Sequence, residues 1–101
     1  MIHEYTESDP GILSNGTVVV DFYAEWCGPC KKYAPVFEEL SKEFFSMTFV
    51  KVNTDDHEAL VQKYMIMSLP TTLVLINGKV SDRVEGYSRD DIKSMIEKFK
   101  M

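Results

Sequence analysis

The fold is decided by the stretch Val18-Val19-Val20-Asp21-Phe22 and by Trp26-Cys27-Gly28-Pro29-Cys30, which follows it closely. The β-branched run predicts a strand over Thr17–Tyr23 that is covered on both faces, because its apolar residues do not alternate strictly with polar ones. Residues 31–45 show the apolar spacing of an amphipathic helix. The chain's two cysteines therefore stand at a strand-to-helix turn, two residues apart, which is a place for thiol–disulfide exchange.

The segments on either side of this stretch complete an alternating pattern of strands and helices. We expect a short first strand over Ile2–Tyr5, a short helix near Ile12 and Leu13, and a strand over Thr48–Asn53. The helix after that strand is expected to be capped by Asp55 or Asp56. Strand, helix, strand in this order implies a parallel crossover. We expect this helix to bury three residues: Ala59, Leu60 and Tyr64.

The last third of the chain predicts a hairpin and a closing helix. Strands over Thr72–Ile76 and Val80–Glu85 flank Asn77-Gly78, a pair typical of tight hairpin turns. Ser88 followed by Asp91 resembles the start of a capped helix. That helix is expected to bury its apolar residues Ile92, Met95, Ile96 and Phe99. The prediction is one α/β domain over residues 1–101, in which helices cover a mixed sheet.

Composition narrows the class of protein. The net charge is −5 and no basic patch stands out, so we expect no nucleic-acid partner. No stretch approaches the roughly 18 apolar residues of a membrane span, and no signal-peptide pattern is visible at the start. Two cysteines are too few for a disulfide-scaffolded secreted domain. A soluble intracellular protein is the expectation.

The spacing of the cysteines suggests a role for each. The thiolate is the attacking species, and a helix N-terminus favours the anion through its unpaired N–H groups and dipole. We expect Cys27, nearer the surface, to attack a substrate disulfide, and Cys30, one turn further in, to resolve the mixed disulfide. A zinc site is the alternative for such a pair. It would need a second pair, which the sequence lacks, and His3 and His57 are poor substitutes, so we expect no metal.

Three other residues stay ambiguous on the residues alone. Asp21 within an apolar strand is either an acid at the strand's edge or a buried acid with a function. Pro70, in Ser68-Leu69-Pro70-Thr71, could simply mark the start of a strand. Trp26, as a lone tryptophan, could belong to the core or to a contact surface.

The pattern resembles the thioredoxin family over nearly the whole chain, and this resemblance implies the thioredoxin fold. Asp21 then matches the buried acid behind the cysteine pair, which can accept a proton from Cys30, and Lys51 matches the lysine near that acid. Pro70 matches the cis-proline that faces the cysteines and keeps metal away from them. The Gly28-Pro29 pair places no cation between the cysteines, which favours a reductase over an oxidase or isomerase.

The resemblance also implies a substrate-binding surface, and on that surface several residues of this sequence differ from the residues usual in the family. Trp26 matches the exposed tryptophan beside the reactive cysteine, and Gly86 matches a glycine that lets substrate approach. The backbone before Pro70 would pair with an extended substrate segment. The departures from the more usual residues are Tyr23, Met65, Met67, Ser68, Leu69, Glu85 and Tyr87. Met67 is expected to line the groove.

The function implied by the resemblance is that of a protein-disulfide reductase. Such a protein carries electrons and maintains cell redox homeostasis, binds no cofactor beyond its Cys27–Cys30 disulfide, and works as a cytoplasmic monomer. A separate thioredoxin reductase, a flavoenzyme drawing on NADPH, would recharge it. Two alternatives remain: a dedicated redoxin that serves one pathway, and a subunit that uses the fold only for docking.

Overall fold

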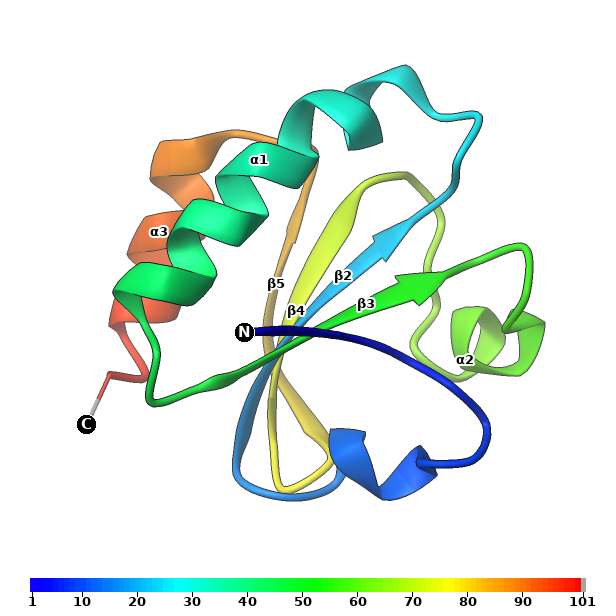
Figure 1. Cartoon of the computed structure of the whole chain (residues 1–101), viewed down its shortest axis with the longest axis horizontal. Coiled ribbons are helices and arrows are strands. Elements are labelled where there is room, and N and C mark those ends of the chain that lie inside the picture. The colour runs from blue at the N-terminus through cyan, green and yellow to red at the C-terminus, as the bar shows by residue number, and fades with distance from the viewer. Residues whose placement is uncertain (101) are drawn as a thin grey trace.

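The computed structural model describes residues 1–100, which form a five-stranded mixed sheet with helices on both faces (Figure 1). The strands lie in the order β1-β3-β2-β4-β5. Their bounds are β1 Ile2–Glu4, β2 Thr17–Tyr23, β3 Thr48–Asn53, β4 Thr71–Ile76 and β5 Lys79–Glu85. Strands β1, β3 and β2 pair in parallel, whereas β4 and β5 are antiparallel to their neighbours. The predicted α/β class, a mixed sheet covered by helices, is confirmed.

The central strand β2 supplies residues to both cores. Successive side chains of a strand point to opposite faces, so its residues divide into two sets. Val18 and Val20 belong to a cluster with residues of β4 and with Tyr64 and Ile66, and Val19 belongs to a second cluster with residues of the helix Gly28–Glu43. Asp21 follows Val19 at a spacing of two, which places it on the face of the long helix.

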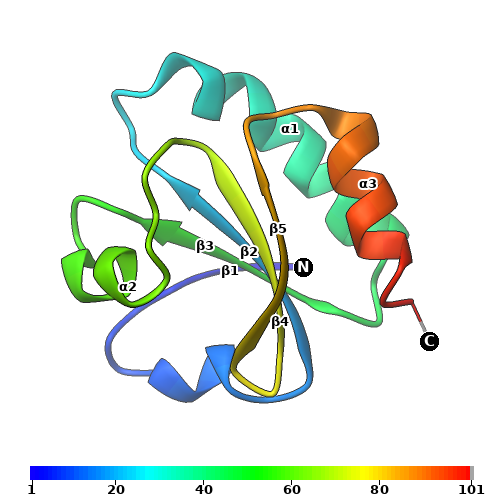
Figure 2. The ribbon, with the colours of Figure 1, turned by 180° about the vertical axis from the view of Figure 1, so that it is seen from behind.

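Helices α1 (Gly28–Glu43) and α3 (Arg89–Glu97) lie side by side over one face of the sheet, and α2 (Glu58–Lys63) lies over the other (Figures 1 and 2). The α1 face is filled by fully buried aromatic and aliphatic side chains, among them Tyr33, Phe37, Leu40, Phe49 and Ile92. Each such side chain contributes roughly 1.5–3 kcal/mol by leaving water. Packing therefore fixes α1 on the sheet and with it the turn at its N-terminus.

The hairpin and the last helix form as predicted. Asn77 and Gly78 both take positive φ, 51° and 86°, as the tight turn between β4 and β5 requires. The Ser88 hydroxyl accepts a hydrogen bond from the Asp91 N–H, at 3.3 Å, and caps α3. Within α3, Ile92, Met95 and Ile96 are buried. Phe99 lies two residues beyond the end of the helix and is partly buried.

Several boundaries differ from the sequence-based prediction. Helix α1 ends at Glu43 rather than at residue 45, and β1 ends at Glu4. The predicted short helix is a 3₁₀ turn, η1, over Pro10–Leu13. The predicted cap of α2 is wrong: the helix begins after His57, and no side chain of the described residues caps it. Of the residues expected to be buried by this helix, Tyr64 is buried, but Leu60 is only partly buried and Ala59 is exposed, because so short a helix turns little surface toward the sheet.

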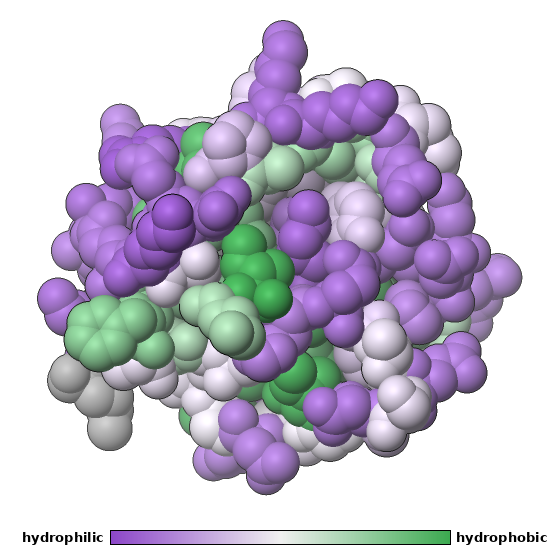
Figure 3. Space-filling view, viewed as in Figure 1, coloured by the Kyte–Doolittle hydropathy of each residue, from purple (hydrophilic) through white to green (hydrophobic). Residues whose placement is uncertain are grey.

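The surface on the side seen in Figure 1 is mostly hydrophilic, with small hydrophobic areas between the charged side chains (Figure 3). Isolated apolar residues of this kind are normal on protein surfaces. Among residues 1–100, no helix has the length and apolar composition needed to cross a membrane.

Candidate active site

The two cysteines lie where strand β2 passes into helix α1. Cys27 is the N-cap residue of α1, and its Sγ accepts a hydrogen bond from the Cys30 N–H at 3.2 Å. Pro29 stands in the first turn, where its missing N–H costs little. Cys27 and Cys30 form a disulfide with a Cα–Cα distance of 5.3 Å. The chain thus places a disulfide at the positive end of a helix.

The two cysteines border different openings. Cys27 lines a groove of about 500 Å³, and Cys30 lines a separate hollow of about 350 Å³. The exposed fractions of the two residues are similar in the disulfide form, 6% for Cys27 and 4% for Cys30. Depth alone therefore distinguishes them less than expected. What distinguishes them is the opening that each one borders.

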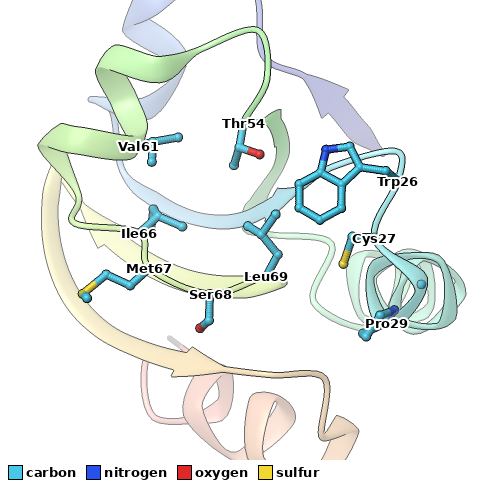
Figure 4. A pocket seen from close by; sticks show the side chains of 10 residues that line it. Trp26, Cys27, Pro29, Thr54, Val61, Ile66, Met67, Ser68 and Leu69 are labelled. Carbon is cyan, nitrogen blue, oxygen red and sulfur yellow. The ribbon is translucent and has the colours of Figure 1, made fainter.

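The groove beside Cys27 is mostly apolar and is built from four segments of the chain: residues 26–29, Thr54, Val61 and residues 66–69 (Figure 4). The α1 turn supplies Trp26 and Pro29, and the loop after α2 supplies Met67, Ser68 and Leu69. In Figure 4, Leu69 points toward Trp26 and Cys27, whereas Met67 lies at the far end and points away from Cys27. Sequence analysis missed three further lining residues: Thr54, Val61 and Ile66.

Trp26 is a surface residue held in place by a long-range hydrogen bond. Its side chain is 71% exposed, which excludes a core role. The indole Nε1–H donates to Asp55 Oδ2 at 2.9 Å. Asp55 was one of the two residues, with Asp56, predicted as the cap of α2; instead, its carboxylate fixes the orientation of the indole at the edge of the groove.

Pro70 follows a cis peptide bond with Leu69, as the resemblance implied. The Pro70 carbonyl accepts a hydrogen bond from the Gly86 N–H at 2.9 Å. Gly86 has a φ of 96°, a conformation that favours glycine, and the space beside its Cα is open. Gly86 and its exposed neighbour Tyr87 are therefore close to Pro70, but neither lines the groove itself.

Asp21 is buried, with an exposed fraction of 1%, so it is not an acid at the strand's edge. Neither carboxyl oxygen has a hydrogen-bond partner within the described residues. Its cross-strand neighbour Thr72 donates its hydroxyl hydrogen to the Tyr33 hydroxyl instead, at 2.9 Å. Loss of hydration raises the pKa of Asp21 from 3.8 to about 7, although Lys51 opposes this shift and Glu4 adds to it.

Lys51 lies beside Asp21 on the neighbouring strand and belongs to a polar cluster. The two residues are register partners in β3 and β2, which places their side chains on the same face. The Lys51 ammonium stands 4.4 Å from the centre of the Tyr23 ring, and the Tyr23 hydroxyl donates to Glu4 at 2.7 Å. Tyr23 and Lys51 also line the hollow next to Cys30. Sequence analysis did not identify Glu4 as part of this cluster.

Within residues 1–100, no three His, Cys, Asp or Glu side chains gather where a metal ion could bind them. The chemistry available at the site is that of the disulfide and of the nearby acid.

Comparison with known proteins identifies the family. The thioredoxin family model matches residues 3–98. The chain is 41% identical to thioredoxin 1 of Plasmodium falciparum over 99 residues, 98% of this chain and 95% of that protein. It is 44% identical to thioredoxin of Chlamydia caviae over 85 residues, 84% of this chain and 83% of that protein. The crystal structure of reduced Schistosoma mansoni thioredoxin superposes with a TM-score of 0.89 at 40% identity, covering 97% of each chain.

These matches extend over both the fold and the cysteine pair. The disulfide that the geometry places at the start of α1 is therefore the redox-active group of a thiol–disulfide oxidoreductase, and the chain belongs to the thioredoxin family.

Proposed function

We propose that this protein is a general protein-disulfide reductase of the cytoplasm, working as a monomer and recharged by a separate thioredoxin reductase that draws electrons from NADPH. The observation that carries the proposal is the position of Cys27, at the N-terminus of α1 and on the wall of an apolar groove. In that position the N–H groups and dipole of the helix stabilise a thiolate, and the groove gives a peptide segment access to it.

The reaction takes two exchange steps. The Cys27 thiolate attacks one sulfur of the substrate disulfide; that bond breaks, a Cys27–substrate disulfide forms, and the first substrate thiolate leaves. Cys30 then attacks Cys27, which restores the disulfide of the protein and releases the second substrate thiolate. The substrate gains two electrons and the protein loses them, so the Cys27–Cys30 disulfide must be reduced again before the next turnover.

Asp21 is proposed to accept the proton that the Cys30 thiol loses in the second step. A carboxyl with a pKa of about 7 exchanges a proton readily near neutral pH. The hollow that Cys30 and Lys51 line lies on this side of the sheet and offers space for a water molecule to relay the proton. Lys51 would then serve to balance the charge of the ionised Asp21.

The substrate is proposed to bind across the groove as an extended segment. Its backbone would pair with the chain next to Pro70, and Gly86 leaves open space beside that point. Trp26 and Leu69 would contact the residues on either side of the substrate cysteine. Gly28, which has no neighbouring atom within 4 Å of where a side chain would begin, leaves the approach to Cys27 free.

An assay with unrelated substrates tests the proposal. With NADPH and a thioredoxin reductase, the protein should catalyse reduction of several unrelated disulfide-containing proteins, and Cys27→Ser should reduce the rate to that of the uncatalysed reaction. A protein that shows no thiol-dependent turnover with any substrate would instead be a docking subunit.

A dedicated redoxin is the second candidate, because large exposed side chains stand at the outer end of the groove and near Pro70. Met67 is 86% exposed there, and Tyr87 is exposed near Pro70. Exposed large apolar side chains gathered at a surface mark a contact site for a partner protein. Activity on one protein substrate and none on the others would support this candidate over the general reductase.

A further inference from the structure

The loop that forms the outer wall of the groove begins at the end of helix α2. Helix α2 finishes in the double hydrogen-bond pattern of a Schellman motif: the Met65 N–H donates to the Gln62 carbonyl at 3.2 Å, and the Ile66 N–H donates to the Val61 carbonyl at 2.9 Å. Val61 and Ile66, the apolar pair that accompanies this motif, both line the groove. The motif therefore connects the end of α2 directly to the substrate-binding wall.

The motif requires a left-handed residue, and here that residue is Met65. Its φ is 53°, in the region that glycine adopts most easily. Met65 also has little burial to hold it, because its side chain is largely exposed. The helix itself spans six residues and has no capping side chain. The local sequence thus gives this turn weak support, and some other contact must hold it.

Arg83 on strand β5 supplies that contact. Its guanidinium donates to the Tyr64 carbonyl at 2.6 Å and to the Met65 carbonyl at 3.1 Å, the two carbonyls at the end of α2. Arg83 is the register partner of Leu73, so its side chain lies on the face covered by α2. The neighbouring Asp82 lies toward the other face and pairs with Lys98 at 2.9 Å. The planar guanidinium can bind two acceptors at once, which a lysine cannot do in the same way.

We propose that Arg83 is a positioning residue for substrate binding: by holding the carbonyls of Tyr64 and Met65, it keeps the segment 65–69 in the conformation that pairs with a protein substrate. This inference rests on the proposed function, because it assigns a role to the binding groove. Arg83 touches neither sulfur, so its influence is confined to substrates large enough to contact that segment.

The test compares a protein disulfide with a small aromatic disulfide that needs no groove. Arg83→Met keeps the apolar stem and removes both donors, and Arg83→Lys keeps the charge. If a substitution leaves the binding conformation populated about one-fifth of the time, the KM of that variant for the protein disulfide rises about fivefold. We expect the larger rise in KM for Arg83→Met. The kcat and the reaction with the small disulfide should stay within about twofold of the unaltered protein. Arg89→Met is the matched control, since Arg89 pairs with Glu39 away from the groove.

A second readout does not depend on activity. Hydrogen exchange at the Met65 and Ile66 amides of the oxidised protein should become faster in Arg83→Met, while amides in α1 keep their rates. Unchanged exchange at both amides would overturn the proposal, as would an unchanged KM. Equal losses with both disulfides would also overturn it, since they would indicate general damage to the fold. A failure of the proposed function would be visible in the unaltered protein, which would then not reduce protein disulfides at all.

Discussion

Replacing Cys30 by serine will convert the protein into a trap for its own substrates. Cys27 keeps its place at the N-terminus of α1 and on the groove, so it still attacks a substrate disulfide. The serine hydroxyl cannot resolve the mixed disulfide, because release requires a second thiolate. Catalytic turnover should fall to background, and covalent adducts should accumulate in a cell extract under non-reducing conditions.

The matched control is Cys27→Ser, which should trap far fewer proteins. Cys30 borders the hollow on the Lys51 side rather than the groove, so its thiol is poorly placed to meet a substrate. Many unrelated adducts on Cys30→Ser would support a general reductase, and one dominant adduct would support a dedicated redoxin. Equal trapping by the two variants would contradict the division of roles.

Replacing Asp21 by asparagine will stabilise the fold at neutral and alkaline pH. The folded state raises the pKa of Asp21 above its unfolded value, so the folded state holds a proton that the unfolded state releases. The free energy of unfolding of the unaltered protein therefore falls as pH rises from 3.8 to about 7. A difference of about three pKa units, at 1.36 kcal/mol each, corresponds to a stabilisation on the order of 4 kcal/mol at pH 8, vanishing near pH 4.

Denaturant unfolding of both proteins at a series of pH values measures this effect. Asp82→Asn is a useful contrast. Hydrogen bonding from Lys98 lowers the pKa of Asp82, so the stability that the Asp82 carboxylate contributes to the folded protein is lost as pH falls. The same Asp21 variant should release mixed disulfides more slowly, since the proposed proton acceptor for Cys30 is gone. A loss of stability in Asp21→Asn at pH 8 would show that the buried carboxylate has a compensating partner.

The local features of this fold could be read from the chain because short-range physics determines them. The β-branched run places β2 in the centre of the sheet, whereas the burial of Asp21 was expected only from the family resemblance. The cysteine spacing sets Cys27 at a helix N-terminus. The turn at Asn77-Gly78 and the Ser88 cap depend on residues three or fewer positions apart.

The parts that the sequence did not reveal depend on contacts between distant segments. Asp55 was expected, as an alternative to Asp56, to cap the following helix, yet its partner is Trp26, 29 residues away. The link from Arg83 to the end of α2 joins residues 18 and 19 positions apart, and no local pattern marks it. The cis bond before Pro70 was expected only from the family resemblance, because most bonds before proline are trans.

The reduction potential of the Cys27–Cys30 pair is the measurement that tests this account most directly. Since Gly28 and Pro29 place no cation between the cysteines, the disulfide should be strongly reducing, near the roughly −270 mV typical of thioredoxins as a family. Equilibration with glutathione buffers, followed by thiol trapping, gives the value. A potential near the roughly −180 mV of a disulfide isomerase would contradict the assignment as a reductase.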